Sequence, residues 1–283
     1  VLVIAGSRGK AGAAGLAGIA ALRTSAGLVT VACPSSIQAT VAAFAPEMMT
    51  EGLPETEKGS LALAAGDELR TLLADKDVIV IGPGLSRHPE TSSLVRELVK
   101  SSRLPIVLDA DGLNAFDGHY DELKRRGDGA PFRVFTPHPG EAGRLLGLST
   151  AQVQQDRLRI AQRIAGETGS CVVLKGSGTV VAGASGETWV NRTGNAAMAK
   201  GGSGDVLSGI IGAALARRRE TESYFLQDVS VAASVYLHGL AGDLARDLLH
   251  ENTVLATDLL EALTEAFRDC ESQAEKGLFY LQK

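Results

Sequence analysis

Short β-branched runs that alternate with helix-length amphipathic segments constrain the fold of this chain more than any other feature. The runs lie at 1–5, 28–32, 78–81, 106–108, 134–135 and 172–174. This alternation is typical of β-α-β units, which stack into a mainly parallel sheet with helices on both faces. A turn at Ala184, Ser185 and Gly186 divides 178–190 into two short strands and predicts an antiparallel hairpin at the sheet edge. We therefore expect a three-layer α/β/α fold.

The segments between the strands carry apolar residues at helical spacing, and each such stripe predicts a helix with one buried face. Ser149 opens a capping box, which predicts a helix that turns Leu158 toward the core. A longer helix near the C-terminus is expected to bury a stripe that includes Phe225 and Ala233. The polar segment 51–59 is instead expected to form a surface loop.

The composition fits a globular protein and argues against partners that need a strong positive field. The chain has 283 residues, 45% of them hydrophobic, which is ample for the core of one large domain over 1–283. With 28 Lys and Arg against 33 Asp and Glu, the formal net charge is −5. This charge does not gather nucleic acid or an anionic membrane, so anionic ligands must be held locally.

The sequence predicts neither a membrane segment nor an oxidising compartment. The apolar stretch 11–22 is too short to span a bilayer and lacks the pattern of a secretory signal. Cys33, Cys171 and Cys270 are odd in number and have no metal-ligand spacing, which favours a reducing, cytoplasmic location and no protein metal site. The chain begins at Val1, without Met, directly in a strand-like run, so we expect the natural protein to start earlier.

The run 193–207 carries the strongest functional signal. Apolar residues recur at helical spacing after Asp205, so Gly201, Gly202 and Gly204 lie at the start of a helix. The first-turn N–H groups have no partner within a helix, and glycines let a phosphate approach them closely. A carboxylate beside that anion is repelled, a cost that makes sense if Asp205 takes a proton from a hydroxyl that attacks phosphorus. The alternative is a simple cap and turn.

Several other loops follow the predicted strands, where the ligands of open parallel sheets bind. The Gly- and Ala-rich turn 5–15 fits either close helix packing or a backbone surface for a flat ligand, and it matches neither a Walker A loop nor GxGxxG. The run 82–84, Gly-Pro-Gly, presents backbone in a fixed shape or makes a plain turn. Asp109 and Asp111 suit a metal, a ribose or a helix cap. These alternatives stay open at the level of sequence.

Two further loops present a histidine and a lysine. His138 lies between Pro137 and Pro139, which restrict the backbone on both sides of it. Of the five histidines, His138 is the one that we expect to contact a ligand; the alternative is a histidine exposed to solvent. Lys175 ends a strand and precedes glycines and hydroxyls that suit a nucleotide. A solvated lysine before a hairpin explains Lys175 by itself, but its combination with Asp205 favours a nucleotide site.

The chain resembles the NAD(P)H-hydrate dehydratase family, which has the ribokinase-like fold, across nearly its whole length. The resemblance is carried, in order, by the motifs AGSRGKAGAA, GPGL, DADGLN, TPHPGE, LKGSGT and TGNAAMAKGGSGDVLSG. GxGD alone also occurs in sugar and vitamin kinases of this fold, but TPHPGE followed by KGxxT and GNxxMAxGGxGD is typical of the dehydratases. The resemblance implies a single ribokinase-like domain with a mainly parallel sheet.

The resemblance also implies a lyase that repairs NADH or NADPH after water has added to the nicotinamide ring. The bacterial form AMAKGGSGD favours ADP, converted to AMP and phosphate, over ATP. The implied substrate-binding residues are Ala13 or Ala14, Gly84, His138 and Asp205. The implied nucleotide-binding residues are Lys175, Gly176, Ser177, Gly178, Thr179, Asn195 and Gly204. A homo-oligomer, a tetramer in the family, and a fused or separate epimerase for the same hydrates are implied as partners.

The expected mechanism is half kinase and half lyase. Asp205 accepts the proton of the ring hydroxyl, and the N–H groups of Gly202, Ser203 and Gly204 stabilise the transferring phosphoryl group, with Mg²⁺ as cofactor. Two alternatives stay open. One is a kinase of a small alcohol, such as a sugar or vitamin precursor, that uses the same Asp205. The other is a nucleotide-binding module without catalysis.

Overall fold

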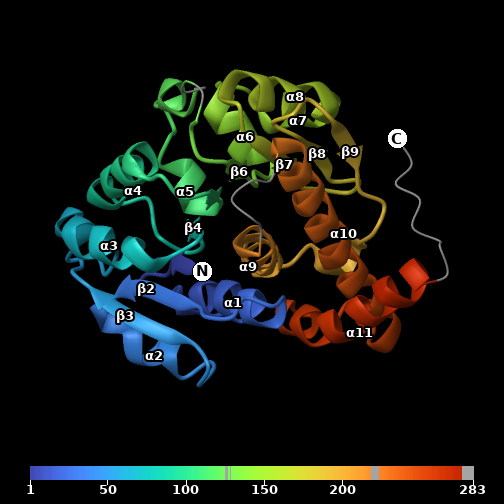
Figure 1. Cartoon of the computed structure of the whole chain (residues 1–283), viewed down its shortest axis with the longest axis horizontal. Helices are drawn as coiled ribbons and strands as arrows, with labels where there is room; N and C mark the ends of the chain where they lie inside the picture. Colours follow the sequence, from blue (N-terminus) through green and yellow to red (C-terminus); the bar gives the residue numbers. More distant parts are fainter. Residues whose placement is uncertain (125–126, 128, 218–222, 276–283) are drawn as a thin grey trace.

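The computed structural model describes residues 1–124, 127, 129–217 and 223–275. These residues form a nine-stranded sheet with helices on both faces, the three-layer arrangement expected (Figure 1). The strands are β1 (Leu2–Ile4), β2 (Thr30–Pro34), β3 (Met49–Leu53), β4 (Ile79–Ile81), β5 (Ile106–Leu108), β6 (Arg133–Phe135), β7 (Cys171–Leu174), β8 (Val180–Ala182) and β9 (Thr188–Val190). The six predicted strands and the hairpin are therefore confirmed.

The strands follow the order β3-β2-β1-β4-β5-β6-β7-β8-β9. Strands β1 to β7 pair in parallel, and the β8–β9 hairpin adds an antiparallel edge. The expected surface loop at 51–59 is wrong at its start, because β3 pairs with β2 from Met49 opposite Thr30 to Leu53 opposite Pro34. β3 is an edge strand with mostly exposed or half-exposed side chains, so pairing rather than propensity makes it a strand.

The described helices cover both faces of the sheet. They are α1 (Ala11–Arg23), α2 (Gln38–Ala42), α3 (Gly66–Leu72), α4 (Pro89–Ser101), α5 (Ala110–Asn114), α6 (Pro139–Leu146), α7 (Thr150–Gln155), α8 (Arg157–Thr168), α9 (Ser203–Ala216), α10 (Tyr224–Leu248) and α11 (Ala256–Glu275). Successive strand residues point to opposite faces. Ile79 and Ile81 pack with α3 to α8, whereas Val78 and Val80 pack with α1, α2, α9 and α10. Helix α11 packs outside this layer, on α10 and α1 (Figure 1).

The helix predicted after Ser149 forms as two helices. The capping box of Ser149 and Gln152 is present and starts α7. Helix α7 ends at Asp156, whose side chain accepts the amide hydrogen of Arg159 and caps α8. Leu158 lies in the first turn of α8 and is 44% exposed, so the expectation that it faces the core was wrong.

The buried face of α10 also differs from the predicted stripe. Phe225 is 46% exposed and Ala233 is exposed, whereas Asp228 and His238 are buried. Asp228 accepts two backbone N–H groups of the β8–β9 turn. Buried polar groups are stable when they are hydrogen-bonded, so this helix turns Asp228 and His238 inward and leaves Phe225 and Ala233 at the surface.

The chain changes direction between β1 and β4, which places the expected ligand crevice. It moves from β1 outward through β2 and β3, then returns to β4 on the other side of β1. Ligands of open α/β sheets bind beyond the carboxyl ends of the strands at such a point. The loops after β1, β4 and β5 and the start of α9 meet there (Figure 1).

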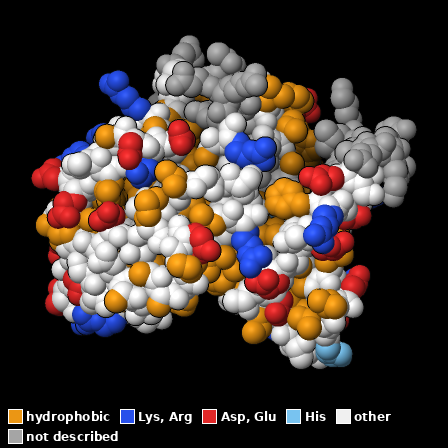
Figure 2. Space-filling model, turned by 60° about the horizontal axis from the view of Figure 1, so that its bottom comes forward, with side chains coloured by type: hydrophobic (Ala, Val, Ile, Leu, Met, Phe, Trp, Pro, Cys, Tyr) orange, Lys and Arg blue, Asp and Glu red, His pale blue; other side chains and the backbone are white. Residues whose placement is uncertain are grey.

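Acidic and basic side chains are interspersed on the face shown in Figure 2, which is notched at its lower edge. This face carries no large patch of one charge, in keeping with the nearly balanced composition. Among the described residues, no helix combines the length and the apolar character that a membrane span requires.

Candidate active site

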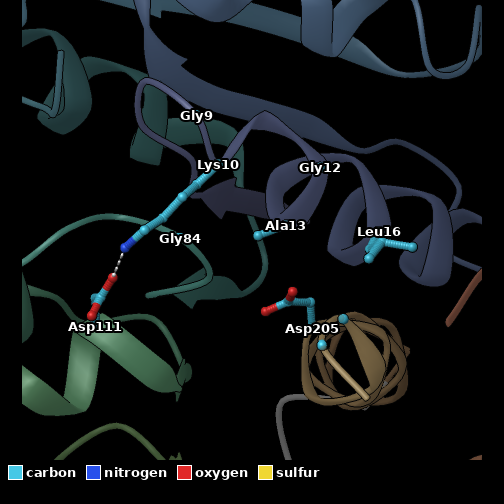
Figure 3. Close-up of a pocket in the computed structure, with 10 residues that line it drawn as sticks. Gly9, Lys10, Gly12, Ala13, Leu16, Gly84, Asp111 and Asp205 are labelled. Atoms are coloured by element: carbon cyan, nitrogen blue, oxygen red, sulfur yellow. Dashed lines mark hydrogen bonds and ion pairs between the residues drawn. The ribbon is translucent and has the colours of Figure 1, made fainter.

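A cavity of about 450 Å³ opens at the point where the strand order changes direction (Figure 3). Its lining comes from the loop after β1 and the start of α1, from the loop after β4, from α5, and from the residues just before α9 and its first turn. The lining residues are Gly9, Lys10, Gly12, Ala13, Leu16, Gly84, Asp111, Gly201, Gly202 and Asp205. The structure thus brings together three of the predicted substrate residues, Ala13, Gly84 and Asp205.

Asp205 projects from the first turn of α9 into this cavity (Figure 3). Burial raises the pKa of its carboxyl to about 7, and the Asp109, Asp111 and Glu141 carboxylates add to the rise, while Lys175 opposes it. A carboxylate with a pKa near neutrality is a better base than an ordinary aspartate and is still ionised at neutral pH in a useful fraction of molecules. The environment of Asp205 therefore suits a general base.

The start of α9 is held in place from two sides. Gly202 is the N-cap residue and has a φ of 98°, a left-handed conformation that glycine adopts without strain. His238 of α10 lies with its Nε2 2.9 Å from the carbonyl oxygen of Ser203, and burial lowers the pKa of this histidine to about 4. A neutral His238 therefore donates through Nε2 to Ser203. Lys200 donates to the carbonyl oxygens of Asn252 and Val254 and fixes the loop before the helix.

Lys175 and Asp109 form an ion pair beside this first turn. Lys175 Nζ lies 2.7 Å from Asp109 Oδ1 and 4.0 Å from Glu141 Oε2. Burial alone favours the neutral amine, but the two carboxylates outweigh it and raise the pKa of Lys175. Asp109 is fully buried and does not cap α5 with its side chain, so the helix-cap alternative is wrong for this residue. Sequence gave no sign of the pair, because 66 residues separate its members.

His138 is the N-cap of α6, and this fixes its tautomer. Its Nδ1 accepts the N–H groups of Gly140 and Glu141, while the Glu141 side chain accepts the N–H group of His138. Burial and the charges of Lys175 and Arg144 lower the pKa of the imidazole, which keeps it neutral. The proton of the neutral ring is then on Nε2, which lies 3.3 Å from Glu141 Oε1. His138 does not line the cavity, so its predicted contact with the substrate stays a prediction.

Of the two alanines in the N-terminal loop, Ala13 lines the cavity, whereas Ala14 is fully buried beneath it. Gly84 has a φ of 64°, and a Cβ there would lie 3.0 Å from the Cβ of Ala13. Ser7 Oγ donates to the carbonyl oxygen of Gly84 at 2.7 Å and joins the two loops. The two loops therefore pack closely on this side of the cavity.

The predicted nucleotide loop 175–179 lies between β7 and β8, next to the Asp109 pair. Gly176, Ser177 and Gly178 are exposed, and Arg157 donates from below to the carbonyl oxygens of Ser177 and Leu174. The loop therefore has a fixed backbone and an open outer side.

Asn195 makes its contacts within the protein. Its amide donates to the carbonyl oxygen of Gly242 at 2.9 Å and to Asp243 Oδ1 at 2.8 Å, and its Oδ1 accepts the N–H group of Ala197. It ties the loop before α9 to α10. Its predicted contact with a nucleotide stays a prediction.

Sequence reasoning did not assign Lys10, Leu16 or Asp111 to the cavity wall. Lys10 Nζ lies 3.2 Å from Asp111 Oδ2, which also accepts the N–H group of Ser86 at 2.8 Å (Figure 3). The two acids of the Asp-x-Asp motif thus have different partners. Asp109 turns inward to Lys175, whereas Asp111 turns outward to Lys10.

No group of three or more His, Cys, Asp and Glu side chains in the described part of the chain is arranged to hold a metal ion. The three described cysteines are free and buried or half-buried.

Comparisons with known proteins agree with this geometry. The sequence profile of the family described as NAD(P)H-hydrate dehydratase matches residues 1–265. The "bifunctional NAD(P)H-hydrate repair enzyme" of Moorella thermoacetica is 44% identical over 275 residues, which is 97% of this chain and 50% of that protein. The chain thus spans about half the length of the curated relatives it matches.

Solved structures show the same architecture. An ADP/ATP-dependent NAD(P)H-hydrate dehydratase of Bacillus subtilis, co-crystallised with ATP and Mg²⁺, superposes with a TM-score of 0.77 at 29% identity over 95% of this chain and 88% of that one. A ribokinase-like superfamily protein of Enterococcus faecalis gives a TM-score of 0.76 at 30% identity over 94% of this chain and 86% of that one. The expected ribokinase-like fold is confirmed.

Proposed function

This chain belongs to the NAD(P)H-hydrate dehydratase family, and from that premise we propose that it returns hydrated NADH or NADPH to the reduced cofactor at the expense of a nucleotide. One observation carries the proposal. Asp205, a carboxylate with a raised pKa, faces a cavity at the first turn of α9, where backbone N–H groups suit a phosphoryl group. A base and an anion site in one cavity are what phosphoryl transfer to an alcohol needs.

The proposed reaction has two stages. Hydroxide is a poor leaving group from a ring carbon, and phosphate is a good one. Asp205 takes the proton of the ring hydroxyl. The hydroxyl oxygen bonds to the terminal phosphorus of ADP, and the bond from that phosphorus to the bridging oxygen breaks, so that this oxygen leaves with AMP. The ring nitrogen then donates its lone pair as the C–O bond to phosphate breaks, and loss of a ring proton restores the reduced nicotinamide. ADP therefore becomes AMP and phosphate.

The residues of the site divide between these stages. The N–H groups of Gly202, Ser203 and Gly204 act on the phosphoryl group, whose negative charge spreads over its oxygens during transfer. We assign loop 175–179, between β7 and β8, to the nucleotide, and Ala13 and Gly84, which line the cavity, to the nicotinamide side of the dinucleotide. The neutral His138 donates from Nε2 and does not compete with Asp205 for the proton.

Mg²⁺ is the proposed cofactor and neutralises charge on the nucleotide phosphates when bound. The cavity wall carries the carboxylates of Asp111 and Asp205, which are oxygen donors of the kind that Mg²⁺ prefers and would hold a nucleotide-bound ion directly or through water. The B. subtilis relative was crystallised with ATP and Mg²⁺. For this chain we propose ADP as the preferred nucleotide.

The wider setting is also proposed. We treat residues 1–283 as one domain of a cytoplasmic homo-oligomer, a tetramer by resemblance. The relatives are named bifunctional and are about twice as long as this chain. We propose an epimerase for the same hydrates as the second function, fused or separate. Light scattering on the purified chain measures its oligomeric state.

The direct test supplies hydrated NADPH with ADP or with ATP and follows the return of reduced-nicotinamide absorbance. The proposal predicts recovery with one phosphate released for each molecule repaired. A stable phosphorylated product without recovery identifies a small-alcohol kinase instead. Nucleotide binding without phosphate release identifies a non-catalytic module.

A further inference from the structure

Asp109 is a fully buried carboxylate that joins three distant segments of the chain. It follows β5, and its Oδ1 accepts from Lys175 Nζ at 2.7 Å, at the end of β7. Its Oδ2 accepts from Ser208 Oγ at 2.6 Å, in the second turn of α9. Ser208 also donates to the carbonyl oxygen of Gly204 at 3.0 Å. One carboxylate therefore connects the nucleotide loop to the helix that carries Asp205.

The backbone around Asp109 is fixed by close packing. Gly82 has a φ of 131°, and a Cβ there would lie 1.7 Å from the carbonyl oxygen of Asp109. Ala110 has a φ of 46°, a conformation uncommon for a residue with a side chain. The strand end therefore places the Asp109 carboxylate with little freedom.

The ammonium of Lys175 is held next to the first turn of α9. A Cβ on Gly204 would lie 3.2 Å from Lys175 Nζ and 3.9 Å from Asp109 Oδ2, so the glycine leaves that space to the ammonium. The Lys175 side chain is 20% exposed, and that of Asp109 is not exposed at all. The lysine is therefore mostly buried against the first turn of α9, and the carboxylate that holds it is buried completely.

We propose that Asp109 is a positioning residue, which holds the Lys175 ammonium beside the first turn of α9 so that the ammonium and the backbone N–H groups face the same phosphate of the nucleotide. This inference rests on the proposed function. A buried ion pair is weak support for stability, because desolvation offsets the attraction between the charges. A role in placing the Lys175 ammonium accounts for the position of the ion pair at the site.

The pair also affects the base. Asp205 is faced by the carboxylates of Asp109, Asp111 and Glu141 and by the Lys175 ammonium. Replacing Asp109 by Asn removes one of the three negative charges and leaves the ammonium free to act on Asp205. Both changes favour the ionised form of Asp205. The acid limb of the kcat/KM profile then moves to lower pH in the variant, which reports that the pair acts on the charge of Asp205.

The test is a double-mutant cycle of Asp109→Asn and Lys175→Met on the full chain, with kcat, KM for ADP and the pH profile as readouts. Asp109→Asn is expected to lower kcat by about 10- to 100-fold, the cost of misplacing a group at the reacting centre. In the Lys175→Met background the same change is expected to alter kcat by less than about twofold, because the two residues act as one unit. Losses that multiply, or an unmoved acid limb, overturn the inference.

Asp228→Asn is the matched control. Asp228 is as buried as Asp109 and accepts backbone N–H groups, but it lies in α10 against the β8–β9 turn, away from the cavity. This variant is expected to lower the melting temperature and to leave kcat and the acid limb unchanged. A shift of the limb in Asp228→Asn would show that loss of any buried charge moves it and would remove that support.

Two further measurements keep the inference testable in other cases. Where Asp109→Asn does not fold, the cycle uses Ser208→Ala instead, which removes the hydrogen bond to one Asp109 oxygen. If Ser208→Ala lowers kcat as much in the Lys175→Met background as in the wild type, the inference is contradicted. Where the wild-type chain repairs no hydrated NADPH, the proposed function fails, and calorimetry with ADP decides the inference alone. Asp109→Asn is then expected to weaken ADP binding about tenfold, with no further loss in Lys175→Met. Unchanged ADP affinity overturns it.

Discussion

The ammonium of Lys10 lies 3.2 Å from the carboxylate of Asp111 and joins the loop after β1 to α5 at the wall of the cavity that holds Asp205. Lys10 is the one cation among the ten residues that line this cavity. The proposed dinucleotide substrate carries a pyrophosphate. We therefore expect Lys10 to exchange Asp111 for a phosphate of this substrate.

Lys10→Met is expected to raise KM for hydrated NADPH by about three- to tenfold and to leave kcat within about twofold, since the lost contact acts on binding. Stability should change by less than about 1 kcal/mol, because the Lys10 side chain is 52% exposed. Arg8→Met is the control, since Arg8 is an exposed cation two residues earlier that does not line the cavity. An equal rise in KM in both variants would assign the effect to general surface charge.

Gly202→Ala is expected to destabilise the fold by about 1–3 kcal/mol. The residue has a φ of 98°, and its Cβ would lie 2.6 Å from Leu16 Cδ1 and 2.9 Å from Ala256 Cβ. Chemical denaturation measures the free energy of unfolding. Gly201→Ala is the stability control, because a Cβ there meets nothing within 4 Å. A Gly202→Ala variant as stable as Gly201→Ala would contradict the assigned backbone.

The activity of the free enzyme is expected to depend on the ionisation of Asp205. Its pKa is raised to about 7, and the carboxylate form is the base, so kcat/KM should rise with pH through about 7 and then level. A profile of kcat/KM against pH, with ADP and hydrated NADPH both well below saturation, measures this limb for the free enzyme. A flat profile between pH 5 and 8, the range around that pKa, would rule out Asp205 as the titrating base.

The same raised pKa predicts a stability effect. Between the ordinary carboxyl value near 4 and about 7, folded Asp205 binds more protons than the unfolded chain, so this residue makes the fold less stable as pH rises through that range. Asp205→Asn removes this loss of stability, because the asparagine side chain does not ionise. The variant should melt higher than wild type at pH 8, and the difference should vanish below about pH 4. A variant that melts lower at pH 8 would contradict the buried charge.

Much of the fold was predictable because β-branched runs mark the buried parallel strands. β3 escaped prediction because Thr50 and Glu51 are polar and its pairing with β2 makes it a strand. The inward face of α10 escaped because Asp228 and His238 are buried through hydrogen bonds that involve partners distant in the sequence. Hydrophobic periodicity does not detect a buried polar residue whose partner lies elsewhere.

Part of the candidate site could likewise be predicted from the sequence, and part could not. Asp205 and its glycines were predictable, since local sequence determines the first turn of a helix. The Asp109–Lys175 pair was not, because it depends on two parallel strands, β5 and β7, that end at the same edge of the sheet with one strand between them. The tautomer of His138 likewise follows from its capping bonds, which only the folded loop shows.

The central claim is that Asp205 takes the proton of the substrate hydroxyl, and the most direct test measures turnover of hydrated NADPH with ADP by wild type and by Asp205→Asn. General-base catalysis contributes a factor of about 10² to 10⁴ to the rate, so kcat of the variant should fall by at least about 10²-fold. Calorimetry should show that the variant still binds ADP. Turnover within a fewfold of wild type in the folded variant would contradict the claim.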